Sequence, residues 1–314
     1  MRVLDIFRPP LVALDVGTAV TRLSYASGEV LEQPSFEDVR PVMRGGVVAD
    51  IAGVAGVVHA LLGRRKRHWR QRPAAVVCAP SDASDAEREA LLEAVAEGGA
   101  SVVTVVPEPL AAAVGAGVDV ASEYATAIVD IGDGVTDFAV VCNGTIVRSS
   151  AQRIGCGTLR AAVRDWLELR HGRAAVPEET LEEIVRAFCA LDGGPPSSRR
   201  LSRETGGGTP PETAGEDASG SPILETLLDP VIESMAAFLA TSIRELPDAM
   251  AAEVIESGIH VTGGGAHLDR LVRRMESEVG LPLTRASDPL HAVIRGARAM
   301  LRYRYGSTRH LFRP

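Results

Sequence analysis

The sequence predicts an α/β protein made of two related domains. Two strand–turn–strand units of one design carry the aspartates Asp15 and Asp130, which lie 115 residues apart. A third glycine-rich turn, at residues 263–265, follows another apolar strand. Helical segments separate these strands, so sheets covered by helices are expected. A chain of 314 residues is also long enough for two domains of about 150 residues each.

The first unit is a predicted β-hairpin. Residues 11–16 form an apolar run typical of a buried strand, residues 17–20 are a small-residue turn, and residues 22–25 alternate as a returning strand. A strand over 74–79 follows. The next helix begins at the capping-box pair Ser84 and Glu87 and ends at Gly98-Gly99. A further helix over 110–116 begins at Glu108-Pro109.

The second unit repeats the hairpin over 126–131 and 136–142, and Asn143-Gly144 predicts a further hairpin turn. Apolar residues at helical spacing follow over 158–171 and 178–191. The remaining elements are predicted as a helix over 230–246 with Asp229 as its N-cap, a strand over 258–262, a helix over 266–279, a strand over 281–285 and a helix from Asp288.

The domain limits follow from these elements. We place the first domain at residues 1–120, with residues 288–314 packing back on it, and the second at residues 121–287. Residues 192–222 are rich in Gly, Pro, Ser, Thr and charge. Such a segment cannot bury enough apolar surface to form a core, so we predict a disordered insert.

Composition excludes several classes of protein. A net charge of −8 argues against a general nucleic-acid binder. The chain has one lysine, Lys66, which follows Arg65 rather than a glycine loop, and this excludes a Walker P-loop. No apolar run approaches the roughly 18 residues that span a bilayer, and no secretory signal is visible, so a cytoplasmic location is expected.

The cysteines are widely separated and form no CxxC pair. They are interpreted as buried thiols in a reducing compartment, with a metal site as the alternative. The four positions are Cys78, Cys142, Cys156 and Cys189.

The three glycine-bearing turns suggest a polyphosphate site. Glycine turns let backbone N–H groups approach phosphate oxygens, and Asp15 and Asp130 at strand ends could hold a hydrated magnesium ion. Two facing hairpins would then clamp the phosphates, and the flat turn at 262–265 could accept a base or ribose. Taken singly, each Asp-x-Gly turn is more often structural. A dinucleotide motif is excluded because Gly132-x-Gly134 continues into a strand rather than a helix.

The order of these motifs resembles a known superfamily. Residues 14–19 (LDVGTA) resemble the first phosphate motif of the actin–Hsp70–hexokinase group, residues 130–137 (DIGDGVTD) the second, and residues 261–266 (VTGGGA) the adenosine motif. Within the group the chain resembles MreB, through residues 45–50, 82–99, 108–115 and 281–296 in the same order. The resemblance implies an actin-like ATPase fold, with two ribonuclease H-like domains around a nucleotide cleft and reduced outer subdomains.

The resemblance also implies ATP and Mg²⁺ as cofactors and assigns site residues. Asp15 and Asp130 would hold magnesium, and Glu108 would position the attacking water, with a plain N-cap before Pro109 as the alternative. Glu178 and Glu182 would face adenosine, with a solvated helix face as the alternative. The remaining positions are Thr18, Ala19 and Val20 in the first phosphate turn, Gly132, Asp133 and Gly134 in the second, and Gly263, Gly264, Gly265 and Ala266 under the base.

Five residues depart from the MreB pattern. Val20 replaces an asparagine, and Asp133 replaces a glycine, as in eukaryotic actin. Acidic residues are expected at the positions of Gly157 and Arg160, and a lysine at that of Val185. We therefore expect nucleotide binding with either slow ATPase activity coupled to assembly or none, in which case the chain is a degenerate, non-hydrolysing scaffold.

The resemblance finally implies partners. MreB-like proteins form filaments at the inner membrane and organise cell shape or envelope synthesis, so self-association and envelope-synthesis partners are expected, with no nucleic acid. A basic cluster, including Arg64, Arg65, Arg67 and Trp69, falls where the family places its membrane-facing loop. Its charges would attract anionic lipid. An exposed arginine-rich loop without a role is the alternative.

Overall fold

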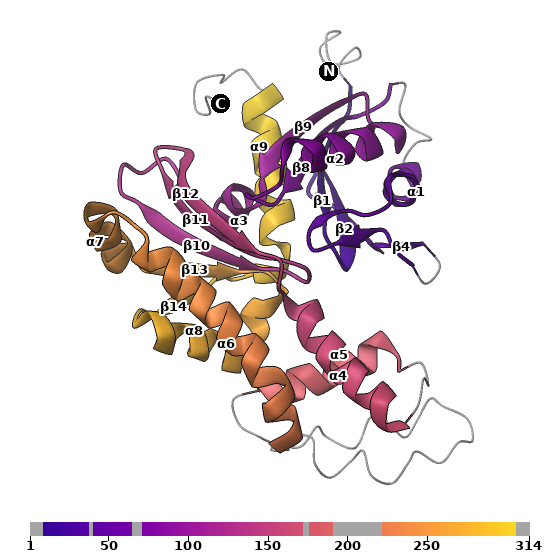
Figure 1. Cartoon of the computed structure of the whole chain (residues 1–314). Helices are drawn as coiled ribbons and strands as arrows, with labels where there is room; N and C mark the ends of the chain where they lie inside the picture. The colour runs from indigo at the N-terminus through magenta and orange to yellow at the C-terminus, as the bar shows by residue number, and fades with distance from the viewer. Residues whose placement is uncertain (1–8, 38–39, 65–70, 172–175, 191–221, 306–314) are drawn as a thin grey trace.

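The computed structural model describes residues 9–37, 40–64, 71–171, 176–190 and 222–305. Within these ranges the chain forms two lobes, each built on a five-stranded sheet (Figure 1). The first lobe has the strand order β3-β2-β1-β8-β9, and the second has β12-β11-β10-β13-β14. Of the predicted insert at 192–222, residues 192–221 lie outside the described residues, whereas Pro222 begins a helix. Residues 65–70, most of the basic cluster, also lie outside the described residues.

The first lobe is a mixed sheet in which β1 pairs antiparallel with β2 and parallel with β8. Its strands are β1 (Leu11–Val16), β2 (Val20–Tyr25), β3 (Val30–Pro34), β8 (Ala74–Ala79) and β9 (Val102–Pro107), and its helices are α1 (Ile51–Gly63), α2 (Asp85–Glu97), α3 (Glu108–Ala116) and α9 (Ala292–Tyr305). Alternate residues of β1 face opposite ways. Val12 and Leu14 pack with α1 and α2, while Ala13 packs with α3 and α9.

The second lobe repeats this plan, because β10 pairs antiparallel with β11 and parallel with β13. Its strands are β10 (Thr126–Ile131), β11 (Thr136–Cys142), β12 (Thr145–Gln152), β13 (Ile259–Thr262) and β14 (Leu283–Arg285), and its helices are α4 (Cys156–His171), α5 (Glu178–Cys189), α6 (Pro222–Arg244), α7 (Asp248–Ser257) and α8 (Asp269–Val279). The predicted α/β class with two related sheets is confirmed.

Between β3 and α1 the described chain forms only two short hairpins. They are β4 (Phe36–Glu37) with β5 (Arg40–Pro41) and β6 (Met43–Arg44) with β7 (Val47–Val48). α1 itself was not predicted from the sequence, although Asp50 caps it by accepting a hydrogen bond from the Gly53 backbone N–H at 3.1 Å.

Two helix boundaries differ from the sequence prediction. α6 begins at Pro222 rather than at residue 230, so Pro230 lies inside the helix. Asp229 is therefore not an N-cap, and instead its carboxylate accepts hydrogen bonds from Arg270 at 3.0 and 3.2 Å. The helix extends past Pro230 because its apolar face is buried on both sides of the proline. This face contains Leu224, Leu228 and Ile232.

The predicted helix over 266–279 is also divided. Gly264–His267 is a 3₁₀ helix, and α8 begins only at Asp269. The next strand, β14, begins at Leu283 instead of residue 281. Asp288 precedes a second 3₁₀ helix, Pro289–His291, before α9.

α3 and α9 cross with their backbones in contact, between the two sheets. A Cβ atom built on Gly115 would lie 1.7 Å from the carbonyl oxygen of Ala292. One built on Gly296 would lie 1.7 Å from that of Ala111. We call Gly115 and Gly296 the glycine crossing. The apolar cluster around it contains residues of both sheets, so this crossing joins the two lobes and fixes where α3 begins.

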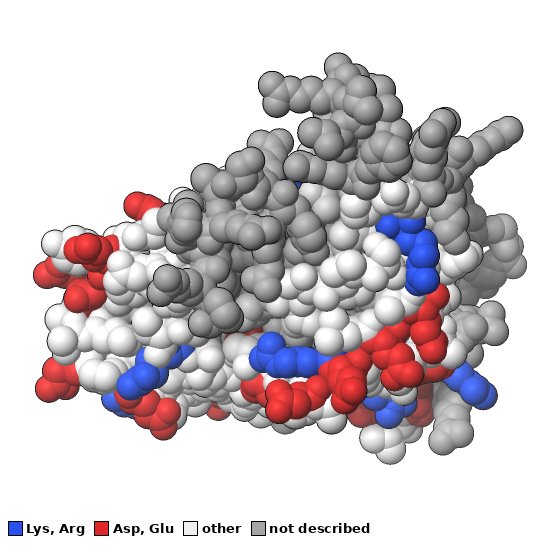
Figure 2. Space-filling view, turned by 90° about the horizontal axis from the view of Figure 1, so that it is seen from above, with Lys and Arg blue, Asp and Glu red and all other residues white. Residues whose placement is uncertain are grey.

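One exposed face of α2 carries acids at intervals of four residues. These are Asp85, Glu89, Glu93 and Glu97. Figure 2, viewed from above, shows acidic side chains gathered in a band on the side of the first lobe. Like charges at this spacing repel one another on a helix. The four acids therefore give this face of α2 a concentrated negative charge. Among the described helices, none is long and apolar enough to cross a bilayer.

Candidate functional site

The two predicted phosphate turns touch each other where the lobes meet. The β1–β2 turn and the β10–β11 turn approach so closely that a Cβ on Gly134 would lie 2.3 Å from Thr18 Oγ1. Thr18 Oγ1 also accepts a hydrogen bond from the Gly46 backbone N–H at 2.9 Å. The structure thus brings together six predicted positions, all partly exposed: Thr18, Ala19, Val20, Gly132, Asp133 and Gly134.

Asp15 and Asp130 stand at the same place in their two strands, the fifth residue of β1 and of β10. Both are buried. Thr262 Oγ1 donates a hydrogen bond to Asp130 at 2.6 Å. Burial, together with the charge of Asp15, raises the pKa of Asp130 to about 6 in spite of that bond. A buried, mutually repelling pair of carboxylates favours a bound cation.

Glu108 is the first residue of α3 and belongs to the same acidic group. Burial raises its pKa well above the ordinary value, and the charges of Asp130 and Asp15 add to the rise. Pro107 occupies the N-cap position, and α3 has no side-chain cap hydrogen bond. Glu108 is therefore not a capping residue. In its protonated form it can donate to and accept from a water molecule, which suits a positioning role better than that of a base.

The triple glycine at residues 263–265 is explained mainly by packing. A Cβ on Gly263 would lie 2.3 Å from the carbonyl oxygen of Ile131, and one on Gly265 would lie 2.1 Å from Ile131 Cγ2. Gly264 is different, since it is partly exposed and a Cβ there would meet only Leu290 Cδ1 at 3.8 Å. Ala266 is buried. Of the four predicted adenosine positions, Gly264 thus has the most open backbone.

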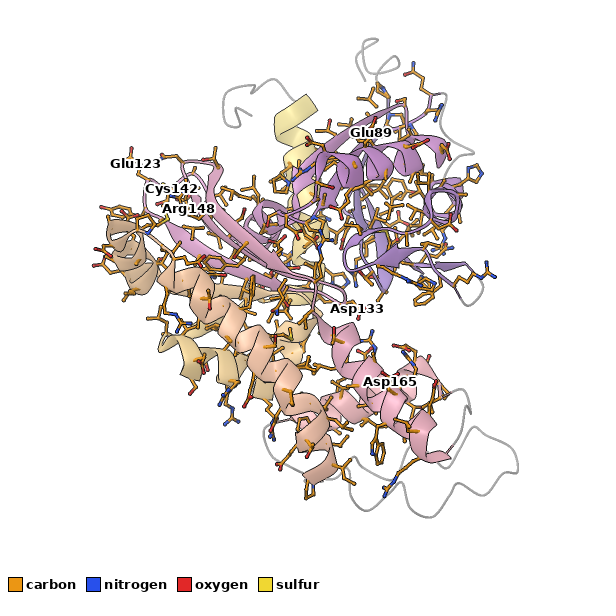
Figure 3. The ribbon with its side chains drawn as sticks, in the orientation of Figure 1. Glu89, Glu123, Asp133, Cys142, Arg148 and Asp165 are labelled. Atoms are coloured by element: carbon orange, nitrogen blue, oxygen red, sulfur yellow. The ribbon has the colours of Figure 1, made fainter. Side chains whose placement is uncertain are left out.

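Asp133 and Arg160, two departures from the MreB pattern, form an ion pair with each other. Asp133 lies where the two lobes meet (Figure 3). The Arg160 Nη2 atom donates to Asp133 Oδ1 at 2.5 Å, and the guanidinium is nearly buried. Gly157, a third departure, lets the start of α4 approach this turn, because a Cβ there would lie 3.0 Å from Asp133. The charge of Asp133 is therefore balanced by Arg160, and the absence of a side chain at Gly157 leaves room for Asp133.

The predicted adenosine-facing glutamates are both ion-paired on a half-exposed face. Glu178 accepts from Arg160 Nε at 2.5 Å and also from Arg164. It is thereby connected through Arg160 to the second phosphate turn. Glu182 pairs with Arg186 of its own helix at 2.7 Å, an ordinary solvated contact. Val185, where a lysine would be expected, is buried in the core of the second lobe.

Sequence reasoning missed Asp137, which joins the two lobes. This buried residue of β11 accepts hydrogen bonds from Ser81 of the first lobe, at 2.7 Å from the backbone N–H and 2.5 Å from the hydroxyl. Nearby, Arg153 binds Asp82 at 2.9 and 3.0 Å. We call these four residues the interlobe contact. The only sequence signal for it was the position of Asp137 inside the second phosphate motif.

The donor set fits magnesium better than a soft metal. Among the described residues, no group of three or more His, Cys, Asp or Glu side chains is placed to hold a metal directly. Magnesium needs only one or two carboxylates, because it keeps several waters, and the buried pair Asp15 and Asp130 would be enough for it.

The cysteines are free in the structure. The prediction of buried thiols is right for Cys78 and Cys189 and wrong for Cys142 and Cys156, which are partly exposed. Cys142 lies with Glu123 and Arg148 at the end of the second sheet far from Asp133 (Figure 3). Its thiol donates to the Glu123 carbonyl oxygen at 3.0 Å, which accounts for a polar group at a partly exposed strand end.

Comparisons with known proteins agree on one family. The family model described as MreB/Mbl protein matches residues 33–308. The cell shape-determining protein MreB of Escherichia coli (strain K12) is 31% identical, with 91% of each chain covered. The cell shape-determining protein Mbl of Bacillus subtilis (strain 168) is 25% identical, over 84% of this chain and 78% of its own.

Solved structures show the same fold. MreB5 of Spiroplasma citri bound to ADP superimposes with a TM-score of 0.76 at 21% identity, covering 95% of this chain and 98% of that one. A MamK double helical filament gives a TM-score of 0.70 at 19% identity, covering 93% and 98%.

Proposed function

The chain belongs to the MreB/Mbl family and has its actin-like fold, and on this basis we propose that it is a cytoskeletal ATP-binding protein. It would bind ATP with magnesium between the two lobes and assemble with copies of itself. Located in the cytoplasm at the inner membrane, it would organise cell shape or envelope synthesis together with envelope-synthesis proteins. The observation that carries the proposal is the contact of the two glycine turns beside Asp15 and Asp130.

The nucleotide would lie along elements already in place. Two solved relatives are described as bound to AMPPNP and to ADP. In this chain the backbone N–H groups of both phosphate turns would face the phosphates. Magnesium, when bound, would neutralise phosphate charge, and Asp15 and Asp130 would hold its water shell. Gly264 would offer open backbone to the adenosine.

Turnover would depend on Glu108. Its side chain shares one electrostatic environment with Asp15 and Asp130, and burial together with their charges raises its pKa well above the ordinary value. Such a group orients a water molecule toward the terminal phosphate without strong base chemistry. The expected activity is a slow ATPase that times the state of the assembly. The rival proposal is a scaffold that binds nucleotide and does not hydrolyse it.

Glu108→Ala is expected to lower phosphate release by about tenfold to a hundredfold, because the water would lose its positioning group. Glu108→Gln should retain much more activity, since an amide can also donate and accept. Phosphate release and light scattering are measured with Mg-ATP for all three chains. A wild-type chain without phosphate release would support the scaffold, and equal rates in all three would refute the role of Glu108.

Assembly at a membrane is proposed from two lines of support. The MamK relative is described as a double helical filament. In this chain the basic cluster around Arg64, Arg65, Arg67 and Trp69 would be attracted to anionic lipid by about 1 kcal/mol per charge near the surface.

Reversing two of these charges should release the chain from lipid. The double variant Arg65→Glu/Arg67→Glu is expected to pellet with anionic vesicles at least about tenfold less than wild type, because two positive charges become negative and the net charge falls by about four units. Arg148→Glu/Arg273→Glu, two exposed positions of the second lobe, makes the same change of net charge and is the matched control. Equal pelleting of wild type and the first variant would contradict the proposal.

A further inference from the structure

We propose that Arg22 is a built-in counter-ion of the nucleotide site. It would supply part of the positive charge that magnesium brings, so that this chain binds nucleotide with a reduced dependence on a divalent cation. The inference rests on the proposed nucleotide site, and it assigns a role to a residue that the sequence motifs left out.

Arg22 faces Asp15 directly across the first hairpin. The two residues are partners in the antiparallel register of β1 and β2, so their side chains point to the same face of the sheet. Arg22 Nη1 lies 3.3 Å from Asp15 Oδ2. Only 12% of the arginine side chain and 8% of the aspartate side chain are exposed, so this pair is poorly screened by water.

The influence of Arg22 reaches beyond its partner. Burial raises the pKa of Asp15, and the charge and hydrogen bond of Arg22 act against that rise. The charge of Arg22 also acts against the raised pKa values of Asp130 and Glu108. One guanidinium therefore counters part of the negative charge of the proposed site, most directly at Asp15, which it contacts.

A second acid holds the guanidinium in place. Arg22 Nε donates to Glu32 Oε1 at 2.8 Å, and the same oxygen lies 3.0 Å from His291 Nε2. His291 Nδ1 in turn lies 2.9 Å from Asp288. These contacts connect β2 to β3 and to the 3₁₀ helix Pro289–His291, whose first carbonyl accepts from the Gly263 backbone N–H at 2.9 Å. A chain of hydrogen bonds thus connects Arg22, through Glu32 and His291, to the segment that contacts the predicted adenosine turn.

This arrangement has a consequence for a polyanionic ligand. Free ATP would approach the buried carboxylates of Asp15 and Asp130, and without a cation their negative charge would repel it. Arg22 lowers the repulsion permanently, whereas magnesium would do so only when bound. Because both cations interact with Asp15, they would also compete in part. Removing Arg22 should weaken binding strongly when magnesium is absent and weakly when it is present.

The test measures ATP affinity in excess Mg²⁺ and in excess EDTA for wild type, Arg22→Gln and Arg22→Lys. The dissociation constant in EDTA is divided by the one in Mg²⁺. This ratio is expected to be higher in Arg22→Gln than in wild type by about tenfold or more, equivalent to about 1.4 kcal/mol. Arg22→Lys keeps the charge and should keep a ratio near that of wild type. The exposed change Arg273→Gln on α8 is the matched control and should leave the ratio unchanged.

Each failure has its own signature. A wild-type chain that binds no ATP in either condition would overturn the proposed function together with this inference. ATP binding by wild type with one common ratio in Arg22→Gln and wild type would overturn the inference alone. A raised ratio in both Arg22→Gln and Arg22→Lys would also overturn it, because the shape of arginine rather than its charge would then matter. Should Arg22→Gln fail to fold, Arg22→Met replaces it as the variant without the charge, and a ratio in Arg22→Met equal to that of wild type overturns the inference.

Discussion

Gly296→Ala is expected to destabilise the chain by about 3 to 5 kcal/mol, a loss that leaves little folded protein. The added methyl group would lie 1.7 Å from the Ala111 carbonyl oxygen and 2.9 Å from the Gly115 nitrogen. Both are backbone atoms inside a neighbouring helix, so no side chain can turn aside to make room. α3 and α9 would have to separate, and the cluster shared by both sheets would open.

Gly56→Ala is the matched control because it makes the same chemical change in a helix. Gly56 is exposed in α1, and a Cβ there meets nothing within 4 Å. Alanine favours the helix by about 1 kcal/mol over glycine, so this variant should be slightly more stable than wild type. Urea unfolding of the three chains measures both effects. Equal midpoints for Gly296→Ala and wild type would show that the two helices are not packed as described.

The stability of the chain is expected to fall as pH rises from about 4 to about 7, owing to Asp137. Burial raises the pKa of Asp137 from the ordinary 3.8 to about 7, in spite of the two hydrogen bonds from Ser81. In this window the folded chain holds a proton that the unfolded chain has lost, so raising the pH favours unfolding. The difference corresponds to at most about 4 kcal/mol, reached above pH 7.

Asp137→Asn should remove this dependence. Asparagine can accept from the Ser81 backbone N–H through its oxygen and donate to the Ser81 hydroxyl through its amide, so the interlobe contact can persist. The unfolding free energy is measured in urea at several pH values for wild type, Asp137→Asn and the exposed control Asp248→Asn. The advantage of Asp137→Asn over wild type should grow with pH. Parallel curves for these two chains would contradict the assignment.

The strands were predictable because each carries a local signal. β1, β8, β10 and β11 occupy the predicted residues, since each is a short apolar run bounded by turn residues. The capping box of α2 is likewise local, and both of its hydrogen bonds are present, at 2.8 and 3.3 Å. Asp15 and Asp130 follow from these strands, because a residue at a strand end takes its place from the strand.

Other features depend on contacts that no local pattern records. α6 runs through Pro230 because its apolar face is buried, which outweighs the local preference of proline for a helix start. Asp133 and Arg160 looked like two separate defects in the sequence. They are 27 residues apart, on a turn and on α4, and only the fold shows that they form an ion pair with each other. Asp137 likewise has its partner in the other lobe.

The repeated hairpin gives the molecule an approximate internal twofold symmetry that its charges break. The register pairs Asp15 with Arg22 in one half and Asp130 with Asp137 in the other. At equivalent positions, then, one half carries a cation and the other an acid. Arg22 contacts Asp15 of its own hairpin, whereas Asp137 accepts hydrogen bonds from Ser81 of the other lobe. A ligand bound between the two hairpins would therefore face one whose charge pair is internal and one whose acid is tied to the opposite lobe, although the two backbones are similar.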